Sequence, residues 1–312
     1  MSSMKAVRIH SYGGPDVLIY EDAPRPMPAQ GEVLIRVLAT SVNPFDCAVR
    51  AGYMAGYFNY TFPLIIGTDV SGVIEELGAG VTDLSVGDEV YTRAGVMRDG
   101  ANAEFVVMPA ADVVAKPKSL DHIHAAALPH VALTAWQALY ELANLQKDQT
   151  VLIHGAGGGV GHIAVQLAKA RGARVIGTAS ENIGLLKELD VDQAINYTTT
   201  PFEEIVHDVD VVLDTVGGET QERSWQTLKP GGILISTIQA PSEELAKAHG
   251  VRQAMVFSSP PIGPTLARVA EMVDAGQIKP IACNVFPLQD IQKAHQLIES
   301  KHSGGKVVLQ VN

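Results

Sequence analysis

The segment spanning residues 150–170 constrains the fold of this chain more than any other. Thr150-Val151-Leu152-Ile153-His154 is a short apolar run of the kind that forms a buried parallel strand. The glycine cluster His154-Gly155-Ala156-Gly157-Gly158-Gly159-Val160-Gly161 follows, and residues 160–170 then have helical composition. A strand that turns through glycines into a helix predicts one βα unit of a dinucleotide-binding sheet.

The spacing of this cluster is [Ala/Gly]-x-x-Gly-x-x-Gly through Gly155, Gly158 and Gly161. The more usual G-x-G-x-x-G does not fit, because position 160 is valine. Small residues still permit the tight turn and let the backbone approach a pyrophosphate at the helix start. We therefore expect Gly155, Gly157, Gly158, Gly159, Val160 and Gly161 to hold a dinucleotide; a purely structural glycine turn is the alternative.

Strand and helix patterns continue to alternate after the glycine cluster. Strands are predicted at 174–178, 193–197, 209–214 and 232–237, with helices at 183–189 and 220–228 between them. Such alternation specifies an α/β domain with a doubly wound parallel sheet. The region before the first strand, 125–143, is rich in alanine and leucine and is predicted to be helical.

The two ends of the chain have a different pattern. Short strands at 32–37, 70–77 and 104–108 are separated by glycine and proline turns, which is typical of a β-rich, barrel-like domain. Helices at 265–275 and 288–300 and β segments at 281–286 and 306–311 close the sequence. We predict one domain from residues 1–120 plus 260–312, with the dinucleotide-binding domain at 121–259 inserted.

Composition narrows the classes of partner. A formal net charge of −11 disfavours nucleic acid and anionic membranes, because such a surface repels phosphate. Two cysteines, Cys47 and Cys283, exclude a disulfide framework and a four-thiolate zinc site. We find no apolar segment of membrane-spanning length and no signal peptide, so a cytoplasmic protein is expected.

The second strand of the predicted sheet bears on the choice of cofactor. It runs Ile176-Gly177-Thr178-Ala179-Ser180, without the acidic residue that usually bonds the ribose 2′-hydroxyl of NAD. Ser180 leaves room for a 2′-phosphate, which favours NADPH, although Glu181 would be an awkward neighbour if it pointed inward. Lys187 is the nearest cation on the following helix.

Motifs along nearly the whole chain resemble the zeta-crystallin-like quinone oxidoreductases of the medium-chain dehydrogenase/reductase superfamily. The motifs that carry the resemblance are Met4-Lys5-Ala6-Val7, Ser41-Val42-Asn43-Pro44-Phe45-Asp46, Arg50-Ala51-Gly52-Tyr53, Gly67-Thr68-Asp69-Val70-Ser71-Gly72, Val86-Gly87-Asp88-Glu89-Val90, the glycine cluster, Asp214-Thr215-Val216-Gly217-Gly218 and Gly305-Lys306-Val307-Val308. The resemblance implies a Rossmann domain inserted in a GroES-like catalytic domain.

Zinc-using members of the superfamily place a cysteine near Asn43 and Gly-His-Glu near Gly67. This chain has Asn43 and Gly67-Thr68-Asp69 instead, and neither an amide nor a hydroxyl replaces a thiolate or imidazole well. His122, His124 and His130 lack a ligand motif, so we read them as solvated or capping residues. Catalysis without a metal is expected.

The resemblance also implies roles for single residues. Asn43 would lie near the nicotinamide and Tyr53 in the substrate cleft; Thr134 would bond the cofactor, Ser180 the 2′-phosphate, and Tyr197 would flank the adenosine. Val216, Ile238 and Phe257 would line the nicotinamide cleft. Local alternatives stay open: Asn43 before Pro44 could shape a turn, Tyr53 could be packing, and Tyr197 could end a strand.

The activity implied is NADPH-dependent hydride transfer to a quinone or related conjugated carbonyl. The alternatives are an alkenal or enone reductase and a non-catalytic, NADPH-binding crystallin-like protein. Asn43, Tyr53, the cofactor ribose or water would hold the developing negative oxygen. Family members are often dimers or tetramers joined through a Rossmann edge strand, for which 232–237 and the segment before Phe257 are candidates.

Overall fold

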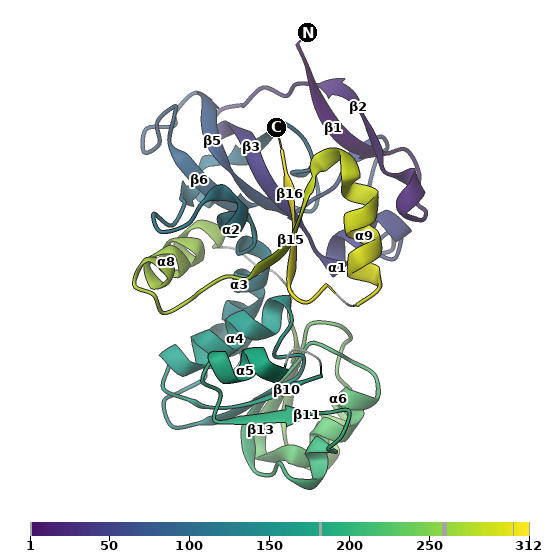
Figure 1. The fold of residues 1–312 in the computed structure, drawn as a ribbon, viewed down its shortest axis with the longest axis vertical. Helices are drawn as coiled ribbons and strands as arrows, with labels where there is room; N and C mark the ends of the chain where they lie inside the picture. Colours follow the sequence, from purple (N-terminus) through teal and green to yellow (C-terminus); the bar gives the residue numbers. More distant parts are fainter. Residues whose placement is uncertain (1, 181–182, 258–260, 302, 312) are drawn as a thin grey trace. The chain divides into compact units, whose positions relative to one another are not determined.

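The computed structural model describes residues 2–180, 183–257, 261–301 and 303–311 (Figure 1). The described residues form two compact units. One, the β-rich unit, comprises Met1–His130, Pro260–Ala275 and Pro280–Asn312; the other, the αβ unit, comprises Val131–Ser259 and Gly276–Lys279. Both ends of the chain therefore belong to the same unit. The boundary predicted at 259–260 falls outside the described residues.

Two sheets build the described part of the β-rich unit. The larger runs in the order β15 (Ala282–Pro287), β16 (Lys306–Gln310), β3 (Glu32–Val42), β5 (Asp69–Leu77), β6 (Glu89–Arg93) and β8 (Val114–Ala115), and β7 (Phe105–Pro109) also pairs with β3. The smaller runs β2 (Ile19–Pro24), β1 (Ser3–Ile9) and β4 (Leu64–Ile65). Apolar side chains such as Val33, Ile35 and Val37 on β3 are buried and form the core of the unit.

The C-terminal strand has a register that matters for the site. β16 is antiparallel to β3 and pairs Val307 with Val42, so Lys306 comes opposite the residue that follows β3. That residue is Asn43, the N-cap of α1 (Pro44–Ala51). The unit also contains α2 (His122–Ala126), α8 (Ile262–Asp274) and α9 (Ile291–Glu299). Pairing of β16 with β3 thus places a cation, Lys306, beside the start of α1.

The αβ unit holds a parallel sheet whose described strands have the order β11-β10-β9-β12-β13-β14. Their bounds are β9 (Thr150–Ile153), β10 (Arg174–Ala179), β11 (Gln193–Asn196), β12 (Val209–Asp214), β13 (Leu228–Ser236) and β14 (Arg252–Met255). The connecting helices are α4 (Gly159–Ala170), α5 (Ile183–Glu188), α6 (Glu219–Ser224) and α7 (Glu243–His249). Figure 1 shows α4 and α5 on one side of the sheet and α6 on the other.

The strand order of this sheet is that of a Rossmann fold. The order reverses between β9 and β12, and such switch points are where open α/β sheets bind ligands. The sheet is buried from both sides, as continuous apolar runs predict: Leu152, Val212 and Leu234 are fully covered. The predicted fold class, a Rossmann sheet inserted in a GroES-like β-rich domain, is confirmed.

The region 125–143 is helical as predicted, and it is divided into α2, α3 (Pro129–Trp136) and a π-helical turn, Gln137–Leu142, because Pro129 lacks the amide that would continue α2. One local prediction was wrong. The segment 232–237 is not an edge strand, because β13 lies between β12 and β14. β14, which precedes Phe257, is the strand at that edge of the described sheet.

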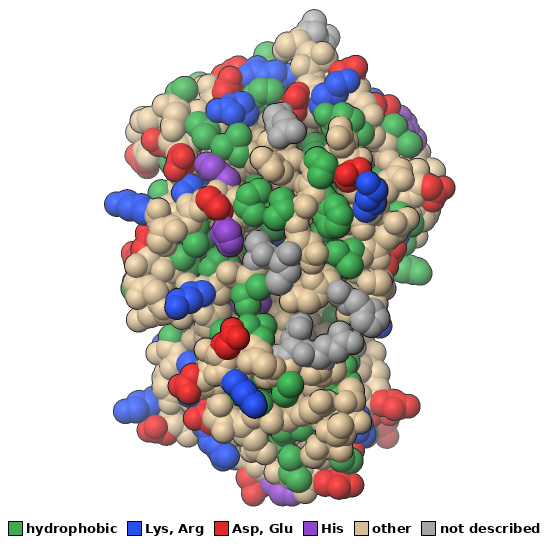
Figure 2. Space-filling model, viewed as in Figure 1, with side chains coloured by type: hydrophobic (Ala, Val, Ile, Leu, Met, Phe, Trp, Pro, Cys, Tyr) green, Lys and Arg blue, Asp and Glu red, His purple; other side chains and the backbone are tan. Residues whose placement is uncertain are grey.

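The surface is mixed in charge. The face drawn in Figure 2 intersperses acidic and basic side chains and does not gather lysine and arginine into one patch. In the described part of the chain, no helix has the length and apolar character needed to span a bilayer.

Candidate active site

The glycine cluster forms the turn between β9 and α4. Gly155 has a φ of +63°, and a Cβ there would lie 2.5 Å from Thr215 Oγ1. A Cβ on Gly161 would lie 2.1 Å from the carbonyl oxygen of Gly155. Since these positions leave no space for a side chain, the backbone follows a tight path that other residues would prevent.

The start of α4 provides amides suited to an anion. Gly158 is the N-cap and makes no side-chain capping bond, and Gly159 and Val160 open the helix. The amides of the first helical turn have no partner within the helix. Exposed Gly158 and half-buried Gly159 and Val160 are therefore placed as a pyrophosphate cradle requires, while Gly157 is buried in the turn.

The His154 side chain holds the start of this loop through two buried hydrogen bonds. It is fully buried, with Nδ1 3.1 Å from Thr178 Oγ1 and Nε2 2.9 Å from Ser224 Oγ. Because Ser224 Oγ donates to the carbonyl of Thr220, it accepts from His154 Nε2–H, which leaves Nδ1 as the acceptor from Thr178. Burial lowers the pKa of His154 to about 4. The ring is a neutral structural link rather than an acid or base.

Five of the predicted cofactor residues lie just beyond strand ends of the parallel sheet. They share the carboxyl edge, where Rossmann folds bind their ligands. Tyr197, Val216, Ile238 and Phe257 are each about half exposed or more, with values of 52%, 49%, 52% and 66%. Tyr197 follows β11, Val216 follows β12 and Ile238 follows β13. Phe257 comes after β14, and Ser180 comes after β10.

The end of β10 bears on the choice between NADPH and NADH. The strand ends at Ala179, and Ser180 follows as a half-buried residue. Glu181, which we considered an awkward neighbour, lies outside the described residues. Lys187 is exposed on α5, and buried Thr134 lies on α3.

The β-rich unit holds a buried polar cluster around Asn43. The Asn43 backbone amide donates to Asp46 Oδ2 at 2.7 Å, which closes a capping box at the start of α1. Its side-chain Nδ2 donates to Thr68 Oγ1 at 3.0 Å and to Asp69 Oδ2 at 2.9 Å. Asn43 is only 1% exposed. Both hydrogens of its amide are therefore directed at protein oxygens.

Lys306 supplies the positive charge of this cluster. Its Nζ donates to Asn43 Oδ1 at 2.6 Å and to Asp69 Oδ2 at 3.2 Å. Asp69 also accepts from Ser41 Oγ and, at 2.6 Å, from the amide of His130. Burial alone would raise the pKa of Asp69, but Lys306 and these donors hold it below its ordinary value. The result is a buried ion pair that fixes which way the Asn43 amide faces.

Asp46 and Tyr60 border a small cavity in the same unit. Its volume is about 20 Å³, enough for roughly one water molecule. The hydroxyl of Tyr60 has no hydrogen-bond partner among the described residues, and burial raises its pKa to about 12. Burial also raises the pKa of Asp46 to about 7. A quinone ring does not fit this cavity, although a water does.

Tyr53 follows α1 on an exposed turn. Gly52 adopts a φ of +87°, and the Tyr53 amide donates to the carbonyl of Ala48 at 3.0 Å. The Tyr53 side chain is 76% exposed. Such exposure fits a side chain that meets a substrate better than one that packs in a core.

The three histidines that invited a metal reading have other partners. Asp121 caps α2 by accepting from the amide of His124 at 2.8 Å, and Asp121 Oδ1 is also 2.7 Å from His124 Nδ1. His122 Nδ1 lies 2.8 Å from Ser71 Oγ. In the described parts of the chain, no group of three or more histidine, cysteine, aspartate or glutamate side chains could hold a metal ion.

Comparisons with known proteins identify the family. Residues 29–118 match the family model described as an alcohol dehydrogenase GroES-like domain, and residues 189–309 match one described as a zinc-binding dehydrogenase. The chain is 35% identical to the NAD(P)H oxidoreductase RTN4IP1, mitochondrial, of Danio rerio, over 99% of this chain and 91% of that protein. It is 31% identical to the 2-haloacrylate reductase of a Burkholderia species, over 97% and 98% of the two chains.

A solved structure agrees with these relatives. The quinone oxidoreductase from Coxiella burnetii superimposes with a TM-score of 0.93 at 34% identity, over 100% of both chains. The chain belongs to the zeta-crystallin-like quinone oxidoreductases. It is thus an oxidoreductase of the medium-chain dehydrogenase/reductase superfamily that uses a nicotinamide cofactor.

The residues of this quinone oxidoreductase homologue fit a dinucleotide but not a zinc ion. A Cβ at Gly155 or Gly161 would clash within the glycine turn, and the turn leads into the first amides of α4, which suits a pyrophosphate. At Asn43, by contrast, the Lys306 ammonium already binds the amide and carboxylate oxygens that a metal would need. The charge of a second cation there would oppose that of Lys306.

Three buried charged residues of the candidate site were given no role in the sequence analysis. Lys306 and Asp69 form the buried ion pair, and Asp214 accepts four hydrogen bonds at the end of β12. Lys306 opens an otherwise apolar strand, Val307-Val308-Leu309, and a lone charge beside such a run was the available signal.

Proposed function

We propose that the chain is an NADPH-dependent quinone oxidoreductase that passes hydride to a quinone or related conjugated carbonyl without zinc. The observation that supports this most is the Lys306–Asn43–Asp69 cluster, in which an ammonium group stands among the positions that hold zinc ligands in metal-using relatives. Acceptors that take hydride without a Lewis acid are the chemical class that suits such a site.

The cofactor proposal rests on the carboxyl edge of the αβ sheet. Gly155, Gly157, Gly158, Gly159, Val160 and Gly161 would hold the pyrophosphate, with Thr134 and Tyr197 bonding or flanking other parts of the dinucleotide. Ser180, which follows β10, stands where NADH-selective proteins have an acidic residue, and its hydroxyl would donate to the 2′-phosphate. This supports a preference for NADPH.

The chain's own residues would act mainly by positioning and by excluding water. Reduced nicotinamide, when bound, supplies the hydride. Val216, Ile238 and Phe257 present apolar surface at the sheet edge and would keep water from that ring. Asn43 and Tyr53 would face the acceptor. Because both Asn43 amide hydrogens are engaged, a hydrogen bond from Asn43 to the acceptor oxygen requires the release of Thr68 or Asp69.

The proton that completes the reduction is proposed to come from water or Tyr53. Exposed Tyr53 is reachable by solvent, so Tyr53→Phe should reduce turnover only modestly if water supplies the proton. A loss of several orders of magnitude would make Tyr53 the acid.

An alkenal or enone reductase is the second candidate. One relative is named for 2-haloacrylate, a conjugated acid rather than a quinone, and it covers 97% of this chain at 31% identity. Both candidates share hydride transfer to a conjugated carbonyl, so they differ in the acceptor and not in the cofactor site.

Assembly, location and domain limits are also proposals. We propose a dimer or tetramer joined through β14, the strand at one edge of the described sheet.

A cytoplasmic location is proposed from the low cysteine content, whereas vertebrate relatives carry the word mitochondrial in their names. The catalytic domain is proposed at 1–120 plus 260–312, and the dinucleotide domain at 121–259.

The decisive experiment follows oxidation of NADPH and, separately, NADH by purified protein in the presence of a chelator. The acceptor panel holds a benzoquinone, a naphthoquinone, an enone and an alkenal. Turnover that is selective for NADPH and fastest with a quinone supports the proposal. Faster turnover with the enone or alkenal selects the second candidate. Tight NADPH binding without turnover on any acceptor contradicts both.

A further inference from the structure

The carboxylate of Asp214 organises the carboxyl edge of the αβ sheet. It is fully buried at the last residue of β12. Oδ1 accepts from the amides of Val216 at 2.9 Å and Gly217 at 2.8 Å. Oδ2 accepts from Gln221 Nε2 and from Ser236 Oγ, each at 2.9 Å. Four donors match the four lone-pair directions of a carboxylate, so its charge is fully satisfied within the fold.

The Asp214 carboxylate is also linked, through Ser236, to the loop that follows β13. The Ser236 hydroxyl donates to Asp214 and accepts from the amides of Ile238 at 3.2 Å and Gln239 at 3.4 Å. Gln221 Nε2 also donates to the carbonyl of Gln239 at 3.2 Å. The loops after β12 and β13 are therefore tied to one buried charge.

The two loops present apolar side chains that need such support. Val216 and Ile238 are 49% and 52% exposed, so packing alone does not hold them. Gly217 and Gly218 have φ values of +77° and +58°, conformations available mainly to glycine. A Cβ on Gly217 would lie 3.1 Å from Ile238 Cγ2, which shows how closely the loops approach each other.

We propose that Asp214 is a positioning residue for the nicotinamide end of the cofactor. By fixing the loops that carry Val216 and Ile238, it sets the apolar surface against which the nicotinamide would lie, while the adenosine end depends on other strands. This inference rests on the proposed function, because it assigns the nicotinamide to these two residues. The inference predicts that loss of the Asp214 carboxylate weakens binding of the nicotinamide end of the cofactor and leaves binding of the adenosine end unchanged.

The test is Asp214→Asn, which keeps the size of the side chain but replaces one oxygen with a donor. In either orientation the new amide nitrogen faces two donors, either the Val216 and Gly217 amides or Gln221 Nε2 and Ser236 Oγ, and it accepts from neither, so at least one of the two loops loses its bonds to this side chain. Dissociation constants are measured by fluorescence for NADPH and for adenosine 2′,5′-bisphosphate, which lacks the nicotinamide. We expect NADPH to bind about tenfold more weakly and the bisphosphate to bind within about twofold of wild type.

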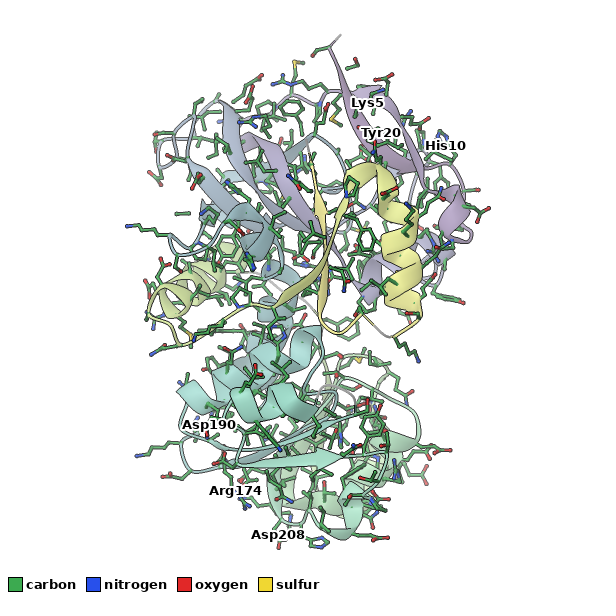
Figure 3. All side chains as sticks on the ribbon, in the orientation of Figure 1. Lys5, His10, Tyr20, Arg174, Asp190 and Asp208 are labelled. Atoms are coloured by element: carbon green, nitrogen blue, oxygen red, sulfur yellow. The ribbon has the colours of Figure 1, made fainter. Side chains whose placement is uncertain are left out.

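Asp210 on the same strand offers a matched control. It lies near the amino end of β12, where it accepts from the Thr150 amide at 2.9 Å and from Gln149 Nε2 at 3.1 Å. Figure 3 labels Arg174, the first residue of β10, and Asp208, just before β12, which mark this amino edge. Asp210→Asn should lower thermal stability, as Asp214→Asn does, but leave both dissociation constants within about twofold of wild type.

A second variant keeps the inference testable if Asp214→Asn does not fold. Ser236→Ala retains the charge of Asp214 and the bonds to Val216 and Gly217, but it removes the link to Ile238. It should weaken NADPH binding by roughly threefold and spare the bisphosphate. Equal weakening for both ligands, or none for either, would overturn the inference. Wild-type protein that fails to bind NADPH would overturn the proposed function, and the inference with it.

Discussion

Replacing the buried lysine of the Asn43 cluster should destabilise the β-rich unit strongly. In Lys306→Met, Asp69 would keep its hydrogen bonds from Ser41, Asn43 and the His130 amide but lose its ion pair with Lys306. Asp69 is fully buried and Lys306 is 3% exposed, so water cannot replace the missing charge. Breaking a buried ion pair at one partner costs about 3–5 kcal/mol.

This cost converts to a measurable change in melting temperature. For a unit of this size, each kcal/mol shifts Tm by about 2–4 °C, so Lys306→Met should lower Tm by about 6–20 °C. The double variant Lys306→Met with Asp69→Asn removes both charges and should recover part of that loss. Scanning calorimetry of wild type, both single variants and the double variant gives the coupling between the two sites.

The pH dependence provides an internal check on the cause. The pKa of Asp69 is held below its ordinary value, so the pair stabilises the fold above that ordinary value and the stabilisation is lost as pH falls through the folded value. The gap between wild type and Lys306→Met should therefore be widest near neutrality and narrow in acid. A Lys306→Met protein within about 1 kcal/mol of wild type, or a double variant no better than the single one, would refute the reasoning.

Further predictions concern the loop, the helix cap and the cofactor. Gly161→Ala forces a methyl group against the Gly155 backbone and should cost about 1–3 kcal/mol and weaken NADPH binding, whereas Gly184→Ala, with open space on α5, should be neutral or stabilising; calorimetry and fluorescence titration test both. The pKa of Asp46 is raised to about 7 in the folded protein, so protonated Asp46 stabilises the fold in acid. That stabilisation is lost as pH rises toward 7. Asp46→Asn should match wild type near pH 4 and be more stable by about 2–4 kcal/mol at pH 8, as denaturation at both pH values would show; equal stability at pH 8 would contradict this. Ser180→Asp should weaken NADPH binding and leave NADH binding unchanged or stronger, and titrations that show no change in either would remove Ser180 from the 2′-phosphate site.

The sequence predicted the αβ unit well because its signals are local. β9 (Thr150–Ile153), the glycines and the following helix are contiguous, and the turn needs small residues whatever surrounds it. The β12 strand, Val209–Asp214, has the predicted bounds because its apolar residues Val209, Val211, Val212 and Leu213 follow no helical period.

The helix α1 was within reach of the sequence but was not predicted. Asn43, Pro44 and Asp46 are an N-cap, a proline at the first helical position and a residue that closes a capping box. We read Asn43-Pro44 only as a possible turn. The motif resemblance implies a role for Asn43 near the nicotinamide, and the structure shows that the same residue also caps α1.

The buried cluster could not be predicted from local pattern. Lys306 and Asp69 are separated by 237 residues and lie on strands that are not neighbours in the sheet order. Their contact depends on the register between β16 and β3, which pairs Val307 with Val42. Register between strands so far apart is set by the whole core rather than by either segment.

The separation of 237 residues between Asp69 and Lys306 sets the order in which the two parts of the buried cluster are synthesised. Asp69 leaves the ribosome 237 residues before Lys306, which at 5–20 residues per second is a delay of roughly 12–47 s. The αβ unit is encoded entirely between them and can pair its strands in that interval. The carboxylate at Asp69 must stay hydrated until β16 has been made, so the β-rich unit cannot close around its site before Lys306 has been synthesised.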